Sequence, residues 1–497
     1  CDCGTGAEGD CVPGDDTNAG TDPLFPRQTI ANAASRFGTL AVNDTVALCK
    51  GGAFDAAGDL SIGSSRCGAG VACNDLREYT PTTFPGTAKP IINNAVGDVS
   101  LFAFMGDECG VRFLNLALHG NIDTVSHRNR GFFFYAGAHD VTMCNLEMDG
   151  FDIAIYNESN AGNTNNINLT GSTITNSRVQ GYLGSGDNAD INYNHWEGNG
   201  SSTVFDHSIY LSSDSVSVVN MQVIGNYVHG QYGPTCNGVA VVGHVAIDGF
   251  RFENNTIDID AAEATGGCYG VGFSPANQDG GKYLRHANFS GNIIKNGGNT
   301  GFSLENCPDC VIENNLIIQN WPAVYETTGM WINGDTVRAE DDVGDRNLVR
   351  NNTIWFGPDA NKGGIGLGFG SIGTGHVVIN NTITYTATNA APNGFWCYDY
   401  TAPPLSAFAS IDNNHCFSNA PYEWVHGEGS LASWQSTAAP FDADSIGGDP
   451  LFTVAGSDFA PGGGSPLIGA GRAANAPVVD IAGTARPSPP AIGAYEP

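Results

Sequence analysis

The chain repeats one short pattern of apolar and polar positions. Between Ile224 and Cys416, short apolar strands end in an Asn-Asn or Gly-Asn pair, and a further strand follows each pair. The pairs are Gly225-Asn226, Asn254-Asn255, Gly291-Asn292, Asn314-Asn315, Asn351-Asn352, Asn380-Asn381 and Asn413-Asn414. Successive pairs lie 23 to 37 residues apart, an interval typical of solenoid repeats. The pattern therefore predicts a coiled stack with one turn of chain per repeat.

A second repeated element is a short strand of alternating character, which often begins with glycine. Its apolar residues are expected to face inward: Phe132, Ile153, Val239, Val271, Phe302, Ile365 and Phe395. The leading glycine is expected to supply a bend with positive φ. The Asn pair marks another bend, because Asn tolerates the left-handed region and its amide can hydrogen-bond from coil to coil.

Together these elements predict an all-β chain folded as a single right-handed parallel β-helix. The hand follows from the strong preference for right-handed crossovers between parallel strands. Residues 1–55 are expected to form a Cys-rich N-terminal segment, a short capping helix and the first coil. Residues 56–420 are expected to form the β-helix, and residues 421–497 an irregular C-terminal capping segment.

Both ends of the chain carry further motifs. The first runs from Gly14-Asp15-Asp16 through Thr29-Ile30 to Asp44-Thr45-Val46, and the second includes Asp449-Pro450-Leu451-Phe452 and Ile492-Gly493-Ala494-Tyr495-Glu496. The first resembles the start of secreted right-handed parallel β-helix proteins of the pectate-lyase-like superfamily. The second resembles the C-terminal end of secreted and surface-anchored β-helix proteins. This resemblance implies the architecture but not the chemistry, since such relatives range from polysaccharide lyases to adhesins.

Charge and cysteine content narrow the setting in which the protein acts. The chain has 497 residues, and 20 Lys and Arg stand against 51 Asp and Glu, a net charge of −31. This charge disfavours nucleic acid and anionic membrane surfaces as partners. No apolar run approaches the length of a transmembrane segment. Fourteen cysteines indicate an oxidising compartment, so we expect a secreted or cell-surface protein.

Four disulfides are suggested by spacing: Cys67 with Cys73, Cys236 with Cys268, Cys307 with Cys310, and Cys397 with Cys416. The Cys307-Pro308-Asp309-Cys310 spacing is that of a redox motif, but the βαβ context that activates such a thiolate is missing, which favours a structural bond. Cys1 has two interpretations. It is either a lipid anchor or part of a disulfide-linked N-terminus with Cys3 and Cys11.

The resemblance implies that any catalytic site would lie on an outward sheet face, where a base removes a proton beside a uronate. His207, Tyr210 and Arg130 are the candidates for base, acid and carboxylate clamp. Arg128, Tyr135, Tyr156 and Trp396 are candidates for contact with sugar. The expected separation of Arg130 from His207 is two coils, about 10 Å, which suits a binding groove better than one proton-transfer unit. Alternatively, His207 is a hydrogen-bonded turn residue and the tyrosines only cover the surface.

Calcium is the one cofactor that the sequence suggests. Asp335, Asp341, Asp342 and Asp345 crowd one loop and offer oxygen ligands, although a solvated acidic loop explains them equally simply.

One outward column is expected to be smooth and apolar, with Phe133, Ala154, Leu183, Ala240, Gly272, Ile332 and Gly366. Such a stripe favours contact with another protein surface. The first functional hypothesis is therefore an extracellular β-helix protein with a structural, adhesive or glycan-binding role, whose partners are extracellular polysaccharide or other copies of itself. The second is a carbohydrate-active enzyme, a lyase before a hydrolase, that uses a groove on the β-helix face.

Overall fold

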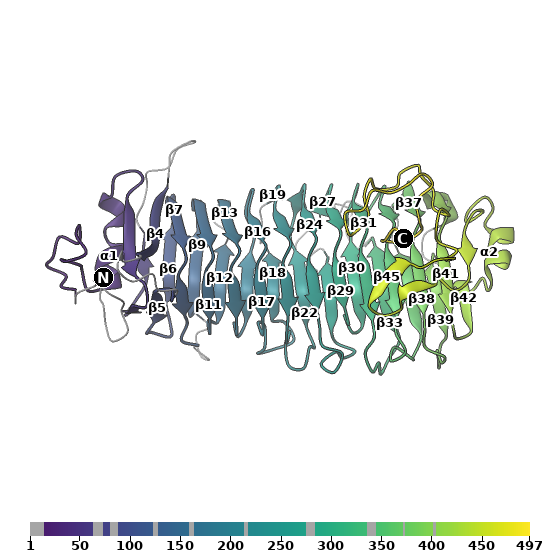
Figure 1. Ribbon diagram of the computed structural model, residues 1–497, viewed down its shortest axis with the longest axis horizontal. Coiled ribbons are helices and arrows are strands. Elements are labelled where there is room, and N and C mark those ends of the chain that lie inside the picture. Colours follow the sequence, from purple (N-terminus) through teal and green to yellow (C-terminus); the bar gives the residue numbers. More distant parts are fainter. Residues whose placement is uncertain are drawn as a thin grey trace. The chain divides into compact units, whose positions relative to one another are not determined.

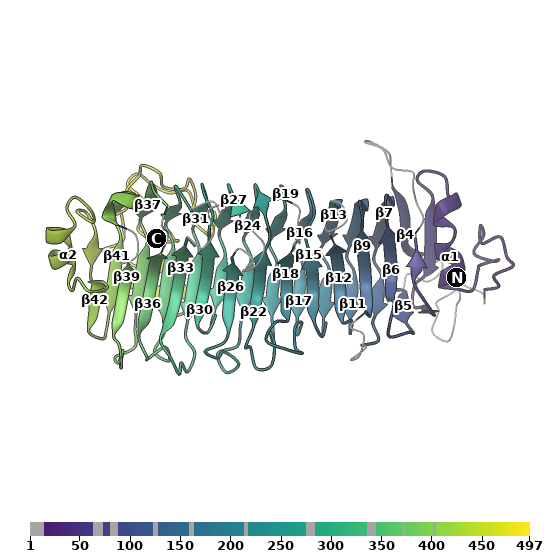
Figure 2. The same ribbon diagram turned by 180° about the vertical axis from the view of Figure 1, so that it is seen from behind.

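The structure is a computed structural model, and it describes residues 14–62, 73–79, 88–122, 128–158, 164–212, 217–274, 284–334, 344–370, 373–400 and 404–497. The chain divides into two compact units, Cys1–Tyr227 and Val228–Pro497, with the division inside β21 (Tyr227–His229). Each unit is a parallel β-helix built from three sheets, here named A, B and C (Figures 1 and 2). This confirms the predicted fold class.

In unit 1 each coil contributes one strand to each sheet, and strands of neighbouring coils pair in parallel. Sheet A contains β1 (Thr45–Cys49), β4 (Asn74–Tyr79), β7 (Cys109–Leu114), β10 (His139–Cys144), β13 (Asn165–Thr170), β16 (Asp190–Asn192) and β20 (Gln222–Ile224). Sheet B contains β2 (Ala53–Ala56), β5 (Ile91–Asn94), β8 (Ala117–His119), β11 (Glu147–Asp149), β14 (Thr173–Thr175) and β17 (His195–Glu197). Sheet C contains β3 (Leu60–Ser61), β6 (Ser100–Met105), β9 (Arg130–Tyr135), β12 (Ile153–Glu158), β15 (Gln180–Gly184) and β18 (His207–Ser212). The short strand β19 (Val218–Val219) precedes β20.

Unit 2 has the same arrangement. Sheet C contains β22 (Val239–His244), β26 (Tyr269–Phe273), β30 (Thr300–Glu305), β33 (Thr327–Asn333), β36 (Gly364–Gly370), β39 (Phe395–Asp399) and β42 (Tyr422–Val425). Sheet A contains β24 (Arg251–Glu253), β28 (Asn288–Ser290), β31 (Val311–Glu313), β34 (Leu348–Arg350), β37 (His376–Ile379) and β40 (Phe408–Asp412). Sheet B contains β25 (Thr256–Asp258), β29 (Ile293–Lys295), β32 (Leu316–Gln319), β35 (Thr353–Phe356), β38 (Thr382–Tyr385), β41 (His415–Ser418) and β43 (Ile446–Gly447). A short pair, β23 (Ile247–Asp248) and β27 (Leu284–Arg285), accompanies them.

Stacked aromatic side chains fill much of the interior. In unit 1 the ring of Phe102 lies 4.7 Å from that of Phe113 and 5.3 Å from that of Phe132, between ring centroids. All three side chains are fully buried. Because each coil adds its own inward side chains to the layer below, the core grows with the number of coils.

The Asn pairs form the ladder expected from the sequence. In unit 2 each second Asn donates from its side-chain amide to the side-chain oxygen of the next, at 2.9 to 3.2 Å, through Asn255, Asn292, Asn315, Asn352, Asn381 and Asn414. The first residue of each Asn-Asn pair has φ between 51° and 57°. At a corner the regular hydrogen bonds between strands are interrupted. The repeated Asn side chains therefore provide hydrogen-bond partners for one another and for the buried backbone groups there.

The predicted positive φ is found at two of the leading glycines, Gly364 (139°) and Gly394 (104°), but not at all of them. Gly270 and Gly301 are absent from the residues with positive φ among the described part of the chain. A Cβ on Gly270 would instead lie 2.5 Å from the Gly301 carbonyl oxygen and 2.6 Å from Cγ2 of Ile294. Glycine is therefore needed there for close approach between sheets C and B.

The predicted register of several sheet C strands is also wrong. In β9 the first, fourth and sixth residues are half-buried, whereas the second and third are both buried, so alternation breaks at the start of the strand. Three residues expected inside, Ile153, Val239 and Ile365, stand at the first, outward position. The inward positions belong to residues two places later, such as Ile155 and Leu367, which are fully buried.

The smooth apolar stripe expected on the surface is present only in part, since Phe133, Leu183 and Gly272 lie half-buried at outward positions. Ala154, Ala240 and Ile332 are 0%, 0% and 1% exposed, and Gly366 is buried. Ala154, Ala240 and Gly366 line the interior because the same break in alternation turns their strand position inward, whereas Ile332 pairs with the inward residue Leu304. The continuous apolar surface that favoured self-association is therefore interrupted, and self-association stays a prediction.

The N-terminal cap is a short helix, as predicted. Helix α1 (Ile30–Ala34) is followed by a 3-10 turn, η1 (Phe37–Thr39), and Thr29 accepts a hydrogen bond from the Asn32 backbone at the helix start. Ile30 and Ala34 are buried, and α1 contacts β2 and β3. The helix thus covers the first coil, whose apolar end would otherwise be open.

The C-terminal part of unit 2 follows a short turn, η2 (Leu405–Ala407), and continues the coil through β42 and β43, beyond residue 420. It also contains α2 (Leu431–Thr437) and an antiparallel hairpin of β44 (Phe452–Val454) and β45 (Asp458–Pro461). Residues 448–497, drawn in yellow in Figure 1, dock on the first Asn of each pair: Asn314, Asn380 and Asn413 donate to the carbonyls of Val479, Arg472 and Ala470. Phe459 packs on Trp355 of sheet B, with ring centroids 5.7 Å apart.

Among the described residues, the hydrogen bonds and ring contacts between residues 448–497 and the coils fall on sheets A and B and on the corner between them. The outer face of sheet C is therefore the face that this segment leaves uncovered.

Candidate functional site

The outer face of sheet C in unit 1 carries two columns of side chains. The first strand positions pair as Arg130, Ile153, Gln180 and His207 on β9, β12, β15 and β18. The fourth positions pair as Phe133, Tyr156, Leu183 and Tyr210. All four residues of the second column are half-buried, so this face presents a row of large apolar and aromatic groups.

Arg130 lies over two aromatic rings of this row. Its guanidinium carbon is 4.5 Å from the centroid of Phe133 and 4.8 Å from that of Tyr156, and the two rings are 5.3 Å apart. Stacking of a guanidinium on ring faces is a favourable cation–π arrangement. Burial lowers the pKa of Arg130, and the neighbouring Tyr156 and Glu158 act in the opposite direction. The guanidinium remains charged, as arginine does in proteins.

Tyr135 and Glu158 extend this group along the next position. The two residues pair on β9 and β12, and the Tyr135 ring lies 6.0 Å from that of Phe133. We refer to Arg130, Phe133, Tyr135, Tyr156 and Glu158 as the Arg130 cluster. It combines one cation, one carboxylate, two phenol hydroxyls and flat ring faces.

His207 and Tyr210 form a separate contact. Their rings are 5.3 Å apart in an edge arrangement, and His207 is only 7% exposed. Two coils, which contribute β12 and β15, lie between β9 and β18, as expected, but the predicted distance of about 10 Å is too short. Three strand spacings amount to about 14 Å. Arg130 and His207 therefore do not form one proton-transfer unit.

The other predicted sugar contacts are divided between places. Tyr135 and Tyr156 belong to the Arg130 cluster. The Arg128 side chain is 67% exposed, and its Nε lies 3.9 Å from Asp98. Trp396 lies in unit 2, on β39. The sequence pattern missed Phe133 as a platform and Glu158 altogether, because both depend on the pairing of β9 with β12.

The predicted calcium loop is only partly within the described residues. Asp335, Asp341 and Asp342 lie outside them. Asp345 accepts a hydrogen bond from the Thr374 backbone at 2.6 Å, and its other oxygen is 3.5 Å from Arg346. Within the described ranges, no group of three or more His, Cys, Asp or Glu side chains is arranged to hold a metal ion. A calcium site at this loop stays a prediction.

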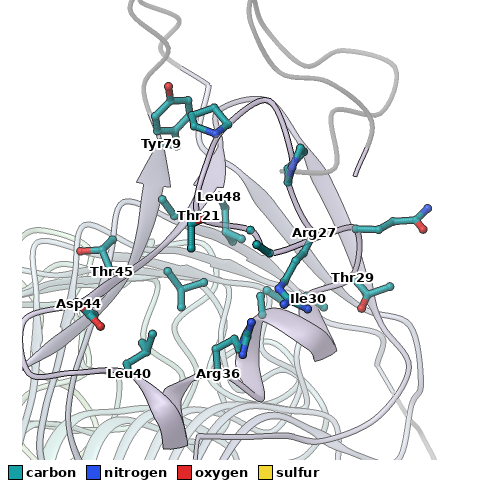
Figure 3. A pocket seen from close by; sticks show the side chains of 18 of the residues that line it. Thr21, Arg27, Thr29, Ile30, Arg36, Leu40, Asp44, Thr45, Leu48 and Tyr79 are labelled. Carbon is teal, nitrogen blue, oxygen red and sulfur yellow. The ribbon is translucent and has the colours of Figure 1, made fainter. Parts of the chain in front are cut away.

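A hollow of about 590 Å³ lies beside the N-terminal cap. Figure 3 shows Arg27, Ile30 and Arg36 near α1, and Thr45 and Leu48 from β1, around it. Arg27 donates to the Asp16 carbonyl and to the Asn32 side-chain oxygen. This arginine therefore ties the N-terminal segment to the cap, and we assign the hollow to the capping structure.

Three of the predicted disulfides are present: Cys236–Cys268, Cys307–Cys310 and Cys397–Cys416. Cys49 and Cys109 are also disulfide-bonded, although spacing alone did not indicate them. Cys73 has a free thiol, so its predicted bond is wrong; it directly precedes β4, which holds it at sheet A. Cys67, Cys1, Cys3 and Cys11 lie outside the described residues.

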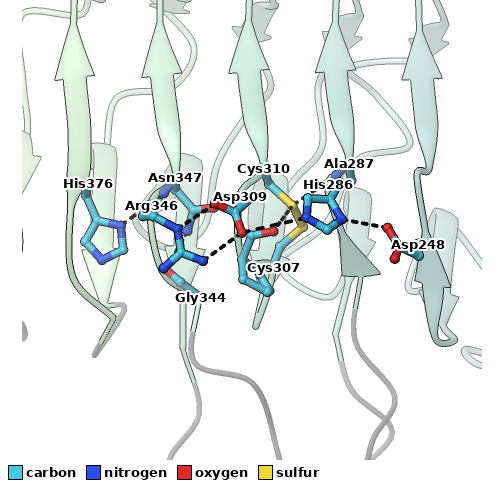
Figure 4. Close-up of a disulfide and its surroundings, with 11 residues drawn as sticks. Asp248, His286, Ala287, Cys307, Asp309, Cys310, Gly344, Arg346, Asn347 and His376 are labelled. Carbon is cyan, nitrogen blue, oxygen red and sulfur yellow. Dashed lines mark hydrogen bonds and ion pairs between the residues drawn. A yellow bond between two sulfur atoms is a disulfide. The ribbon is translucent and has the colours of Figure 1, made fainter.

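Figure 4 shows the Cys307–Cys310 disulfide beside a row of charged residues in unit 2. His286 is 2.7 Å from Asp248 and 3.9 Å from Asp309. Arg346 is 2.6 Å from Asp309 and its hydrogen bond holds the pKa of that carboxyl below the usual value. The charged residues of this row pair with one another, so we interpret the row as a set of surface ion pairs with a structural role.

The fold and this aromatic face define the class: the chain is a parallel β-helix protein. No protein-family model matches the sequence, and no curated protein is significantly similar to it in sequence. The similar solved structures include the Dettilon tailspike protein (13% identity, TM-score 0.42, covering 79% of this chain and 66% of that one).

A second is the A-module of the mannuronan C-5 epimerase AlgE6 of Azotobacter vinelandii (14% identity, TM-score 0.47, covering 84% of this chain and 93% of that one). A third is the surface protein and adhesin PfbA of Streptococcus pneumoniae (12% identity, TM-score 0.46, covering 84% of this chain and 97% of that one). The chain thus spans slightly less than two thirds of the tailspike chain. Function has to be argued from the residues of this chain.

Proposed function

We propose that this protein is an extracellular β-helix protein that binds acidic polysaccharide on the outer face of sheet C in unit 1. The observation that supports this proposal is the Arg130 guanidinium stacked on the rings of Phe133 and Tyr156. A cation held in this way keeps its planar edge in a fixed orientation, and a planar guanidinium matches a carboxylate with two parallel hydrogen bonds. The matching ligand group is the carboxylate of a uronate, whose charge Arg130 neutralises locally against the net charge of −31 on the whole chain.

The rest of the Arg130 cluster suits the sugar ring that carries this carboxylate. The faces of Phe133 and Tyr156 offer flat apolar area, and a few convergent polar groups around such area are typical of ligand sites. Tyr135 and Glu158 can hydrogen-bond to hydroxyl groups. Because neighbouring coils repeat the aromatic row at one strand spacing, the surface suits an extended polymer.

Disulfide bonding supports an extracellular location. At least eight cysteines of the described residues are disulfide-bonded, and such bonds form and persist in oxidising compartments. Among the described residues, no helix has both the length and the apolar character needed to cross a membrane.

Binding is favoured over catalysis on this face. The set of His207, Tyr210 and Arg130, which would serve a lyase or hydrolase, is divided between β9 and β18. General acid–base catalysis needs its groups within hydrogen-bond reach of one reacting centre, and about 14 Å between the strands prevents this. We therefore retain the glycan-binding role and do not propose a reaction.

The test is titration of the full chain with uronate oligosaccharides and with uncharged oligosaccharides of equal length, by calorimetry. We expect the uronate ligand to bind. Arg130→Gln, which removes a charged hydrogen-bonded contact, and Tyr156→Ala, which removes the ring beneath the guanidinium, are each expected to weaken this binding by about tenfold or more. The control is Tyr193→Ala, since Tyr193 is 67% exposed and lies between sheets A and B, after β16. Unchanged affinity in both cluster variants, or no binding by the wild type, would contradict the proposal.

A further inference from the structure

A second group of aromatic and polar side chains lies on the outer face of sheet C in unit 2. The column that starts at the fourth residue of β30 pairs as Ser303, Trp331, Gly368 and Asp399 on β30, β33, β36 and β39. The column continues to His426, because its backbone N–H donates to the carbonyl of Tyr398, the residue before Asp399, at 3.0 Å. Trp396 belongs to the first outward position, paired with Ile365 and Glu423.

The indole of Trp331 lies flat on the neighbouring strand. A Cβ on Gly368 would overlap the six-membered part of this ring, and a Cβ on Gly370 would come within 3.2 Å of its Cζ2. The two glycines thus leave a shallow bed on β36 that the indole fills. Trp331 stays half-buried, so one face is packed and the rest of the ring is accessible.

Trp396 is held by a stack on His426. The two rings are 3.9 Å apart between centroids and inclined by 25°. Nδ1 of His426 lies 3.5 Å from a carboxylate oxygen of Asp399, with side-chain exposures of 41% and 10%. A second indole, an accessible imidazole and a carboxylate therefore stand side by side on β39 and at the end of β42.

We propose that Trp331, Trp396, Asp399 and His426 form a second carbohydrate site, which binds an uncharged oligosaccharide. This inference goes beyond the acidic-polysaccharide function proposed for unit 1 and does not depend on it. Two half-buried indoles supply ring faces for the apolar faces of sugars, and the Asp399–His426 pair supplies hydrogen-bonding groups for their hydroxyls.

The charge of this face selects against acidic sugars. The strands β33, β36, β39 and β42 contain Asp399 and Glu423 but no Lys or Arg. A carboxylate ligand would meet these two acidic groups without a matching cation, which disfavours it. The Arg130 cluster, by contrast, contains a guanidinium that can match a carboxylate, so the two faces are suited to different ligands.

The spacing of the indoles indicates the size of the ligand. Trp331 and Trp396 are two strands apart and offset by three residues, since Thr328 shares a column with Ile365 and Trp396. Two strand spacings and three residues of rise place their Cα atoms about 14 Å apart. A ligand that contacts both indoles must therefore contain several sugar units.

The test is titration of the full chain with uncharged hexose oligosaccharides of four to six units (about the length that spans 14 Å of strand surface), followed by calorimetry and by tryptophan fluorescence. We expect Trp396→Ala and Trp331→Ala each to weaken binding about tenfold or more, while Arg130→Gln and the control Tyr193→Ala bind as the wild type does. Asp399→Asn keeps the shape of the site and is expected to weaken binding about threefold to tenfold.

Asp399→Asn also separates a loss of contact from a loss of folding, because circular dichroism of this nearly isosteric variant is expected to match the wild type. The proposal is overturned if no uncharged oligosaccharide binds, or if the folded tryptophan variants and Asp399→Asn all bind with wild-type affinity. It is also overturned if uronate oligosaccharides compete at the same tryptophans. None of these results bears on the Arg130 cluster, whose own test uses uronate ligands and different variants.

Discussion

His415 gives a sharp prediction about stability and pH. It lies fully buried on β41, with Nδ1 2.7 Å from the Thr382 hydroxyl and Nε2 2.7 Å from the Gly448 carbonyl. The geometry suits a neutral ring, in which Nε2–H donates to Gly448 and Nδ1 accepts from Thr382. Burial lowers the pKa of His415 from 6.5 to about 4, and the hydrogen bond to Gly448 opposes part of this shift.

The sign and size of the effect follow from this shift. Because the folded-state pKa lies below the unfolded value, the unfolded chain binds the proton more readily. The stability is therefore complete above pH 6.5 and declines as the pH falls toward about 4. A difference of about 2.5 pKa values corresponds to about 3 kcal/mol of unfolding free energy.

The assay is denaturant unfolding of the wild type and His415→Gln between about pH 7.5 and about pH 3.5 (a range that brackets both pKa values), followed by circular dichroism. Glutamine preserves a donor and an acceptor but does not titrate. We expect the wild type to lose about 3 kcal/mol more than the variant over this range. His195→Gln is the control, since that side chain is 44% exposed. Parallel pH dependence in wild type and His415→Gln would refute the reasoning.

Two further predictions concern the stack. Asn352→Leu is expected to destabilise unit 2 by about 3 kcal/mol, because Asn352 exchanges hydrogen bonds with Asn315, Asn381 and the Ile312 carbonyl. The control is Asn361→Leu, at an exposed position. Equal denaturation midpoints for the two variants would contradict a stabilising role of the Asn ladder. Gly301→Ala is expected to cost about 1–3 kcal/mol, since its Cβ would lie 2.6 Å from Ile317 Cγ2 and 2.8 Å from the Gly329 carbonyl oxygen. Gly58→Ala, with no atom within 4 Å of its added Cβ, is the control, and thermal melts of both variants measure the difference.

Much of the architecture could be predicted because it depends on local, repeated chemistry. An Asn pair marks a corner wherever it occurs, since Asn tolerates positive φ and a buried amide needs a partner on each neighbouring coil. The ladder from Asn255 to Asn414 and the capping helix α1 are results of this kind. Several disulfides could also be placed, because residues at matching positions of adjacent coils must lie close together.

The Arg130 cluster and the second site depended on register, which the sequence pattern left undetermined. Loops of different length separate the strands, and the first strand positions of sheet C break the alternation of inward and outward residues. A shift of two residues keeps the apolar pattern but changes which side chains meet across strands. For this reason Tyr156 seemed separate from Phe133, and the bed of Gly368 beneath Trp331 could not be anticipated.

The sequence by itself determined that this chain is a stack of coils, because each repeat carries its own corner and its own inward side chains. Only the tertiary structure decided which face is left open and which side chains meet on it. Residues 448–497 dock on sheets A and B of unit 2 through contacts distant in sequence, such as Asn314 with Val479, and leave sheet C uncovered. The pairing of strands then places Arg130 on two rings and Trp396 on His426. These neighbours come from different coils, and packing between coils, rather than any local pattern, brings them together.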